Sequence, residues 1–534
     1  MSVPNPKALI FDLEVVPGAE GAPDRIIKIG ALRADTGQIL EKNVTSKSLI
    51  SALRELDSLA TGASFVMGHN VIEYDLPILR DIAPELKLLE LPVIDTLRLS
   101  PLAFPQNPYH RLIKNYKLIR DSINSPLADC HATLVLFNDQ RVAFERLYET
   151  SQNELRIYHA LIAAQPGAGL GNYMLSQTHQ KAPDVNELRI LIPELMLETD
   201  PTLSRDLKVC RQRLVTMLKD DLVNPAMYWP IAYSIAWLRV SGGNSVLAPW
   251  VRYQFPNVSK LLTELRDQPC DDPACQYCRT THNPAHELKR YFEYDAFRPF
   301  PKNKLGGSLQ QDIVAAGMRG EHVLAILPTG GGKSLCYQVP ALNRFHRNGG
   351  LTIIISPLQS LMKDQVDGLL AKNVQSAATL NGMLTMPERA NTLEMIQMGD
   401  VGILLVSPEQ FRNKAFRSAI EHRQINAWIF DEAHCLSKWG NDFRPDYLYA
   451  SRFIREFSGA HPIAPIGCFT ATAKLEVLDD INEHFKRELN VTLTPFIGGH
   501  ERTNLDFDVM PVSKGEKWHR THHLLNEELG DTPA

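Results

Sequence analysis

The amino-acid sequence predicts an α/β protein in which a helical connector joins two α/β parts. Its 534 residues are about three to four times the length of a typical domain, so two or more domains are expected. Short apolar runs alternate with amphipathic stretches over residues 7–145 and again from Gln310, whereas residues 150–300 mostly follow the helical period. With 44% hydrophobic and 22% charged residues, the composition excludes a collagen-like, mucin-like or wholly disordered chain.

The first α/β part and the connector differ in their periodicity. In the first part, short apolar runs predict strands at Ala8–Phe11, Ile26–Leu32 and Phe65–Met67, and a helix is expected at Leu49–Leu59. In the connector, helical periodicity covers the ranges Glu154–Ala164, Asp206–Leu218 and Val258–Leu265. The apolar run Tyr228–Trp237 is too short for a membrane span and is interrupted by Pro230 and Ser234.

The second α/β part contains apolar runs that are typical of a buried parallel sheet. They are Val323–Leu327, Leu351–Ile355, Gly402–Val406 and Ala427–Phe430. We therefore expect four regions: residues 1–145, a connector over 146–300, a second α/β domain over 301–510, and a linker or tail over 511–534. The chain has no secretory leader pattern and few cysteines, which favours a cytoplasmic protein. Its net charge is −5, so any nucleic acid must be held by a locally basic part of the surface.

A candidate phosphate loop follows the first run of the second part. It comprises Thr329, Gly330, Gly331, Gly332, Lys333 and Ser334. The glycines allow backbone N–H groups to surround phosphates, Lys333 neutralises their charge and Ser334 can bind Mg²⁺. Leu327 stands at the first position of the general pattern, where glycine is usual.

Two carboxylates end the run Ala427–Phe430 and form the second half of this site. Asp431 is expected to hold Mg²⁺ through water, and Glu432 to orient or deprotonate the attacking water. The two elements together predict a nucleotide-hydrolysing site.

The second part resembles the first motor lobe of RecQ-type DNA helicases over about residues 305–510. The matching motifs, in family order, are Leu327–Pro340, Ser356–Val366, Ser407–Glu409, Asp431–Tyr447 and Phe469–Ala473. The resemblance implies a RecA-like lobe that uses ATP, with Gln310 at the position of the glutamine that reads adenine. Gly306–Leu309 departs from the Phe-Arg-Pro-Gly that usually precedes this glutamine.

The resemblance also implies a loop that couples single-stranded DNA to ATP hydrolysis, formed by Trp439, Phe443 and Arg444, although Asn441 replaces the usual His. Exposed aromatic side chains beside basic ones suit base stacking and phosphate contact. An RNA helicase is the weaker alternative. His500–Phe507 resembles the linker to a second lobe that supplies an arginine finger, so we expect this chain to bind nucleotide and to hydrolyse it slowly.

Four carboxylates of the first part suggest a two-metal site. They are Asp12, Glu14, Asp75 and Asp129, and their order and settings resemble the DnaQ-like (DEDD) 3′–5′ exonuclease family, which implies an RNase H-like fold and two Mg²⁺ or Mn²⁺ ions. The family's general base falls at Asn124 or Ser125, neither of which can serve. Three alternatives follow: slow activity, a base recruited from His110 or His131, or a platform that has lost activity.

A cysteine and histidine cluster in the connector suggests a metal centre. Cys270, Cys275 and Cys278, with either His282 or His286, have spacings suited to structural Zn²⁺. An iron–sulfur cluster and free thiols are the alternatives. The other cysteines, including Cys210, are interpreted as packing residues.

The sequence thus favours a nuclease and helicase fusion that acts on single-stranded or 3′-ended DNA, in repair, recombination or defence against foreign DNA. The competing hypothesis is a DNA-binding scaffold that recruits protein partners and has impaired catalytic centres.

Overall fold

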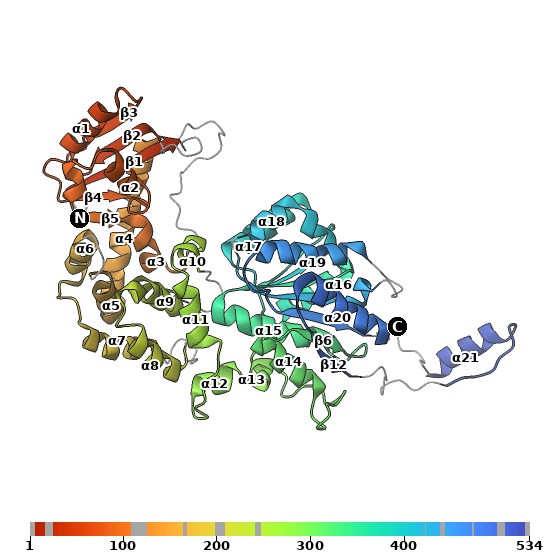
Figure 1. Ribbon diagram of the computed structural model, residues 1–534. Helices are drawn as coiled ribbons and strands as arrows, with labels where there is room; N and C mark the ends of the chain where they lie inside the picture. Colours follow the sequence, from red (N-terminus) through yellow and green to blue (C-terminus); the bar gives the residue numbers. More distant parts are fainter. Residues whose placement is uncertain are drawn as a thin grey trace.

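The computed structural model describes residues 6–16, 25–107, 125–163, 168–197, 209–240, 247–421, 423–437, 444–471, 475–498 and 508–528. Within them, two sheets flank a largely helical region, as Figure 1 shows. This arrangement confirms the α/β architecture with a helical connector.

The N-terminal sheet is mixed, and its strands lie in the order β3-β2-β1-β4-β5. Its strands are β1 (Ala8–Val16), β2 (Arg25–Arg33), β3 (Ile39–Asn43), β4 (Phe65–Gly68) and β5 (Val93–Asp95). The first three pair antiparallel, whereas β4 runs parallel to β1 and β5 parallel to β4. Successive side chains of β1 point to opposite faces of the sheet, and each face has its own apolar core. Ala8 and Ile10 belong to one core, whereas Leu9 and Phe11 belong to the other.

Helices cover both faces of this sheet. They are α1 (Leu49–Leu59), α2 (Asp75–Ile82), the 3₁₀ turn η1 (Lys87–Glu90), α3 (Thr96–Ala103) and the long α4 (Pro126–Thr150). The amino end of α4 lies directly on β2. A side chain at Gly30 would stand 2.4 Å from the backbone N of Leu127, so only glycine permits this approach.

The helical region continues the core on the α4 side of the sheet. Its elements are α5 (Gln152–Ala163), α6 (Ala168–Thr178), α7 (Val185–Leu197), α8 (Arg211–Asp220), η2 (Pro225–Met227), α9 (Tyr228–Val240), α10 (Pro249–Gln254), α11 (Asn257–Arg266), α12 (Gln276–Thr281) and α13 (Pro284–Phe292). One apolar cluster runs from Ala8 in the sheet to Leu265 in α11. The apolar helix α9 lies inside this cluster, and no helix among the described residues is long and apolar enough to cross a membrane.

The second sheet is parallel, with the strand order β12-β6-β11-β10-β7-β9-β8. Its strands are β6 (Val323–Ile326), β7 (Leu351–Ile355), β8 (Ala377–Leu380), β9 (Ile403–Val406), β10 (Ile425–Asp431), β11 (Ile466–Thr470) and β12 (Thr494–Ile497). The strands predicted from sequence agree with these bounds to within two residues. A seven-strand parallel sheet of this kind is RecA-like.

Helices pack on both faces of the parallel sheet. One face is covered by α13 together with α14 (Leu309–Arg319), α15 (Lys333–Asn348) and α16 (Gln359–Ala371). The other face is covered by α17 (Met386–Met398), η3 (Pro408–Arg412), α18 (Lys414–Ile420), η4 (Ala433–Leu436), α19 (Pro445–Ser458) and α20 (Leu475–Leu489). Beyond the sheet, the segment expected to be a linker or tail contains α21 (Lys517–Glu528), which is mostly exposed over residues 517–526 and stands apart from both sheets in Figure 1.

Candidate functional site

The phosphate loop joins β6 to α15. Gly330 and Gly332 both adopt φ +78°, which favours glycine, and a Cβ at Gly331 would lie 2.8 Å from the carbonyl oxygen of Pro328. Lys333 is the first residue of α15, so its backbone N–H has no acceptor within the helix. The loop therefore places the positive end of a helix at the carboxyl edge of the sheet, where anions bind.

The side chain of Lys333 pairs with Glu432 across this edge. Lys333 Nζ donates to Glu432 Oε1 at 3.1 Å. Glu432 follows β10 in a left-handed conformation, with φ 49°, which turns its carboxylate towards the loop. Its second oxygen lies 3.3 Å from His434 Nδ1, and that nitrogen is also 3.0 Å from Thr470 Oγ1 on β11. The structure thus brings together the loop, the two-carboxylate motif and Thr470, a described residue of the Phe469–Ala473 motif.

The protonation of these groups follows from their surroundings. Burial, and then the charge of Glu432, raise the pKa of Asp431 to about 6. Burial also opposes ionisation of Glu432, but hydrogen bonds from His434 and Lys333 outweigh it and lower the pKa of Glu432. Hydrogen bonds with Cys435 and Glu432 raise the pKa of His434 to about 10. These surroundings therefore favour the ionised form of Glu432. Burial makes ionisation of Asp431 costly, and a bound cation would offset that cost.

Gln310 also reaches the phosphate loop. It lies in the first turn of α14, and its Nε2 donates to the carbonyl oxygen of Gly332 at 2.9 Å. Its Oε1 accepts from the backbone N–H of Arg298 at 3.0 Å, and the Arg298 guanidinium donates to the carbonyl oxygen of Gly330. The side chain of Gln310 is only 1% exposed.

Arg298 is a site residue that the sequence analysis missed. The residues Phe-Arg-Pro, expected directly before Gln310, occur upstream as Phe297, Arg298 and Pro299. The segment 300–308 separates them from Gln310, and a bond from Ser308 Oγ to the carbonyl oxygen of Arg298, 2.6 Å long, closes that segment. A search that allowed an insertion inside the motif would have found Arg298.

The expected DNA-coupling loop is described in part. Trp439, Phe443 and the substituted Asn441 lie outside the described residues. Arg444 precedes α19, and its guanidinium donates to the carbonyl oxygen of Pro357 at 3.1 Å, which links two of the motifs predicted from sequence.

In the N-terminal part, three of the four predicted carboxylates gather around the amino end of α4. Asp12 pairs across the sheet with Gly30, on which α4 rests, and Asp129 lies in the first turn of that helix. The negative charges of Asp12, Asp129 and Asp75 all act to raise the pKa of the Cys130 thiol, after the larger effect of burial. Glu14 follows Asp12 by two residues and shares its side of β1.

These carboxylates do not form a compact ligand set. Asp75 is 3% exposed and its Oδ1 accepts from the backbone N–H of Leu13 at 3.0 Å; burial, then the charge of Asp12, raise its pKa well above the usual range. In the described part of the chain, the group whose ligand atoms lie within 4.8 Å of one another consists of cysteines alone. Asn124 and His110 lie outside the described residues, whereas His131 is exposed on α4 and Ser125 caps that helix.

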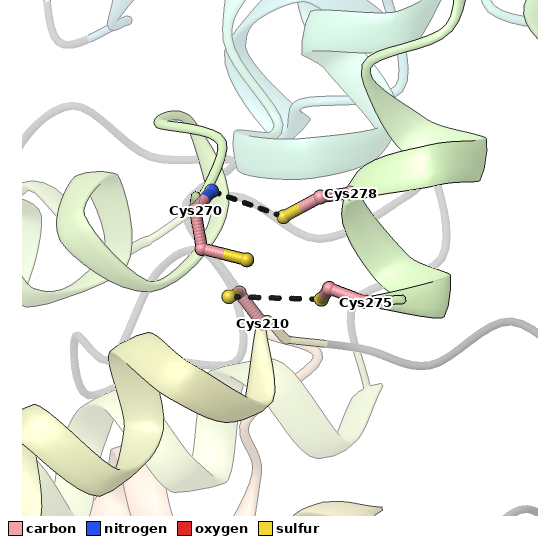
Figure 2. A group of neighbouring side chains, drawn as sticks. All are labelled: Cys210, Cys270, Cys275 and Cys278. Atoms are coloured by element: carbon pink, nitrogen blue, oxygen red, sulfur yellow. Dashed lines mark hydrogen bonds between the residues drawn. The ribbon is translucent and has the colours of Figure 1, made fainter. Parts of the chain in front are cut away.

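The cysteine group contains Cys210, Cys270, Cys275 and Cys278, drawn in Figure 2. Its fourth member, Cys210, corrects two expectations: this thiol is part of the cluster and not a scattered packing residue, and neither His282 nor His286 joins it. Two of the cysteines stand at the starts of helices: Cys210 directly precedes α8 and Cys275 directly precedes α12. Figure 2 shows that both of these helix starts lie beside the loop that carries Cys270. Cys210 lies 65 residues before Cys275 in the sequence, so the short ligand spacings that indicate a metal site could not reveal it.

Neither histidine belongs to the cysteine group. His282 packs edge-on against Tyr277, and burial followed by the nearby charge of Arg347 lowers its pKa to about 4. His286 Nδ1 lies 3.3 Å from Glu287 Oε1.

The cluster is suited to a single metal ion. The Sγ atoms of Cys275 and Cys210 are 3.9 Å apart, and sulfurs around a tetrahedral ion with bonds of about 2.3 Å stand about 3.8 Å apart. An iron–sulfur cluster distributes four thiolates over two or more irons, which requires some of the sulfurs to stand farther apart than the 4.8 Å that encloses all four here. The Cys270 N–H donates to Cys278 Sγ at 3.4 Å and acts to lower the pKa of Cys278, but burial outweighs this bond and raises that pKa, whereas hydrogen bonds overcome burial to lower the pKa of Cys275.

Comparison with known proteins gives the class of the second α/β part. Residues 308–481 match the family of DEAD/DEAH box helicases, so this part of the chain is a DEAD/DEAH box helicase domain.

Three curated relatives are similar to this region. "ATP-dependent DNA helicase RecQ" of Haemophilus influenzae is 37% identical over 220 residues, which cover 41% of this chain and 32% of the relative. "Probable ATP-dependent DNA helicase RecS" of Bacillus subtilis is 38% identical over 211 residues, 39% of each. "ATP-dependent helicase SGS1" of Saccharomyces cerevisiae is 36% identical over 234 residues, 43% of this chain and 15% of the relative. The chain thus spans less than half the length of each of these relatives.

The raised pKa of Asp431 yields a stability test. In the metal-free protein at pH 8, Asp431→Asn should raise the free energy of unfolding by on the order of 1–3 kcal/mol, because it removes a buried, ionised carboxylate. The gain should shrink as the pH falls from about 6 towards 4, since the folded carboxyl then takes up its proton before the unfolded one does. Denaturant unfolding at several pH values measures it, with the exposed Asp364→Asn as control. A gain that does not depend on pH would contradict the assignment.

The cysteine group yields a second test. We expect about one zinc per chain by elemental analysis, lost in Cys210→Ser and Cys275→Ser because each removes one of four thiolates. His286→Ala should keep the metal and serves as the control. Zinc retained by Cys210→Ser, or iron with visible absorbance in the parent, would contradict a four-cysteine zinc site.

Proposed function

We propose that the chain is an ATP-dependent, RecQ-like DNA motor with a metal-dependent 3′–5′ exonuclease domain attached to it. The observation that carries the motor assignment is the Lys333 to Glu432 pair, which joins a phosphate loop at a helix N-terminus to a paired carboxylate motif on the same sheet edge. The names of the relatives support ATP as the nucleotide and DNA as the nucleic acid.

The residues on this edge divide the work of nucleotide hydrolysis. Thr329, the three glycines and Lys333 would hold the phosphates, while Ser334 and Asp431 would hold Mg²⁺, which would neutralise phosphate charge. Glu432 is ionised by its bonds to Lys333 and His434, so it can orient the attacking water or take its proton. When nucleotide binds, its phosphates compete with Glu432 for Lys333 and release that carboxylate.

Coupling to DNA is assigned to the segment that contains Trp439, Phe443 and Arg444. The bond from Arg444 to Pro357 supports this assignment, because it ties the segment to a second motif beside the carboxylate edge. DNA is favoured over RNA, since two of the three relatives named above are DNA helicases by name. We place this work in the cytoplasm, in repair, recombination or defence.

The exonuclease assignment rests on strand order and on α4. The β3-β2-β1-β4-β5 order of the mixed sheet and the helix seated on Gly30 support the RNase H-like fold that we propose, and they bring Asp12 and Asp129 to adjacent elements. Together with Glu14 and Asp75 they would hold two Mg²⁺ or Mn²⁺ ions, which stabilise the attacking and leaving oxygens of a phosphodiester when bound.

A second candidate function, a DNA-binding or partner-recruiting platform, is favoured by Asp75. Its buried carboxyl accepts the backbone N–H of Leu13, which is a structural role, and burial followed by the charge of Asp12 raises its pKa, which disfavours the ionised form that a metal ligand needs. A platform needs the fold but not the metals.

The regions that perform these tasks are proposed as residues 1–145, 146–300, 301–510 and 511–534. Two of these boundaries divide parts that pack together. The boundary at residue 145 cuts α4, which continues beyond it, and the boundary at residue 301 separates α13 from the parallel sheet on which it packs. The four-cysteine group in the second region is assigned to structural zinc.

The motor assignment predicts nucleotide binding that depends on Lys333. Isothermal titration should show Mg²⁺-dependent ATP binding that falls at least about tenfold in Lys333→Ala, because the substitution removes the ammonium that meets the phosphates. The exposed Lys414→Ala is the control. Equal affinity in parent and Lys333→Ala would contradict the assigned loop.

The nuclease assignment predicts removal of nucleotides from the 3′ end of single-stranded DNA with Mn²⁺ or Mg²⁺. Asp12→Ala should abolish it, whereas Asp81→Ala, an exposed carboxylate on α2, should not. Asn124→His should raise the rate by up to roughly 10²–10⁴-fold if the missing base limits it. No digestion by the parent or by Asn124→His, with metal bound, would favour the platform.

A further inference from the structure

We infer that a cleft between the connector and the parallel sheet binds single-stranded DNA and leads the strand from the motor lobe towards the N-terminal part. This assignment rests on single-stranded DNA as the proposed partner, but it requires neither nucleotide hydrolysis nor nuclease activity. The sequence motifs do not predict the site, because its walls come from elements far apart in the chain.

The cleft has a volume of about 910 Å³ and takes one wall from each half of the molecule. The connector contributes Arg252 and Tyr253 at the end of α10 and Ser259 in α11, and the motor lobe contributes the start of β10 and the end of α19. In Figure 1, α10 and α11 lie between the two sheets. Because β10 begins at the cleft and ends at Asp431, the cleft lies at the amino edge of the sheet, and a nucleotide on the phosphate loop would not fill it.

The ring of Tyr253 is held out into solvent at this cleft. Tyr253 is 89% exposed, whereas Val251, two residues before it, is fully buried. Two residues after it, Phe255 packs edge-on against Tyr233 and Trp250. These two anchors fix the backbone of α10 on either side of the exposed ring. An aromatic ring on a fixed backbone is a platform on which an unpaired base can stack with little loss of conformational entropy.

The charged groups that line the cleft favour a polyanion. Arg252 and Arg423 contribute two guanidinium groups, and Glu421 contributes one carboxylate. Arg423 is 4% exposed, and it donates to the carbonyl oxygens of Gly349 at 3.1 Å and Val401 at 2.9 Å, so its positive charge is fixed in the wall. These groups therefore give a locally basic surface that suits phosphates, although the whole chain carries a net charge of −5.

A row of aromatic and arginine side chains leads from the motor motifs to the cleft. Tyr449, Phe453 and Phe457 follow one another at four-residue spacing on α19, so they share one face of that helix. The guanidinium of Arg412 lies 3.9 Å from the centre of the Tyr449 ring, and that of Arg417 lies 4.9 Å from the centre of the Phe453 ring. Phe457 lines the cleft. Since α19 begins directly after the segment assigned to DNA coupling and spans about 21 Å, this row joins that segment to the cleft.

The connector wall of the cleft also reaches the candidate nuclease carboxylates. The guanidinium of Arg98 lies 5.8 Å from the centre of the Phe255 ring and 5.6 Å from the centre of the Trp229 ring. Arg98 forms an ion pair with Glu73, which precedes Asp75 by two residues. A strand in the cleft would therefore lie between the motor lobe and the carboxylates that are proposed to cut it.

The cleft favours a single strand over a duplex. In a duplex the faces of the bases are stacked on one another, so an exposed ring such as that of Tyr253 cannot stack on them, whereas the bases of a single strand offer their faces. A volume of about 910 Å³ also admits a few nucleotides but not a duplex.

The stacking role is tested with a labelled thymidine oligomer of about 20 nucleotides, which is longer than the usual site of one binding module. Its binding is measured by fluorescence anisotropy without added Mg²⁺ or Mn²⁺, so that it is not digested. Tyr253→Ala should weaken binding by about 5- to 100-fold, because one stacked base is lost. Tyr294→Ala is the control, since Tyr294 is 46% exposed but lies beside Lys372 at the end of α16. Equal affinity in the parent and Tyr253→Ala, or an equal loss with a duplex of the same length, would overturn the inference.

The phosphate contact is tested by the salt dependence of the same binding. In Arg252→Gln, the slope of log affinity against log salt concentration should become shallower by about 0.7, the value for one phosphate contact on a single strand. Arg189→Gln, an exposed arginine on α7, should leave the slope unchanged. Photo-crosslinking of a strand that carries iododeoxyuridine should label the peptide 248–259. An unchanged slope in Arg252→Gln, or crosslinks confined to other peptides, would overturn the inference.

Failure of the proposed partner is distinguishable from failure of this inference. If the parent binds no single-stranded DNA, the proposed partner is wrong and the cleft assignment fails with it. If the parent binds single-stranded DNA and both Tyr253→Ala and Arg252→Gln match their controls, only the cleft assignment fails. Because the titrations contain no nucleotide, an error in the assigned phosphate loop would not change their outcome.

Discussion

A buried guanidinium at the carboxyl end of α15 sets a constraint on which both halves of the molecule depend. Arg347 is 2% exposed, and a buried cation is tolerated only when it is paired or hydrogen-bonded. Its NH1 lies 3.6 Å from Asp267 Oδ1, and its NH2 donates to the carbonyl oxygen of Met318 at 3.4 Å. Asp267 follows α11 and leads into the cysteine loop. One helix therefore carries the phosphate loop at its first residue and the attachment of the cysteine cluster at its last turn.

The same helix makes a second buried polar contact with the connector. Asn343 donates to the carbonyl oxygen of Thr281 at 2.8 Å and to Glu287 Oε2 at 3.0 Å, and Glu287 is fully buried. Three of the four cysteines thus lie between Asp267 and Thr281, the two residues that α15 contacts, whereas Cys210 directly precedes α8, which shares a core with the N-terminal sheet. A metal ion held by all four would tie the two halves at one point. Removing it would leave apolar packing and these polar contacts to do so.

In the N-terminal part, close packing at a glycine positions the candidate metal-binding carboxylates. The amino end of α4 approaches β2 where Gly30 has no side chain, and this approach sets Asp129 beside Asp12. Packing between elements brings these carboxylates to neighbouring elements, and burial followed by the charge of Asp12 raises the pKa of Asp75. A nuclease would need bound cations to offset this cost of ionising Asp75, whereas a platform would not.

The sequence by itself determined the local features: strand and helix periods, the helix at Leu49–Leu59, and the phosphate loop and carboxylate motif, whose chemistry depends on residue type at short spacing. It also predicted a metal site at three cysteines that lie within nine positions of one another. Only the tertiary structure decided that Cys210 completes the cluster, that Arg298 returns to Gln310 across an insertion, and that Gln310 is enclosed. The physical reason is that these contacts join residues far apart in sequence, where packing and the satisfaction of buried polar groups, and not periodicity or spacing, select the partner.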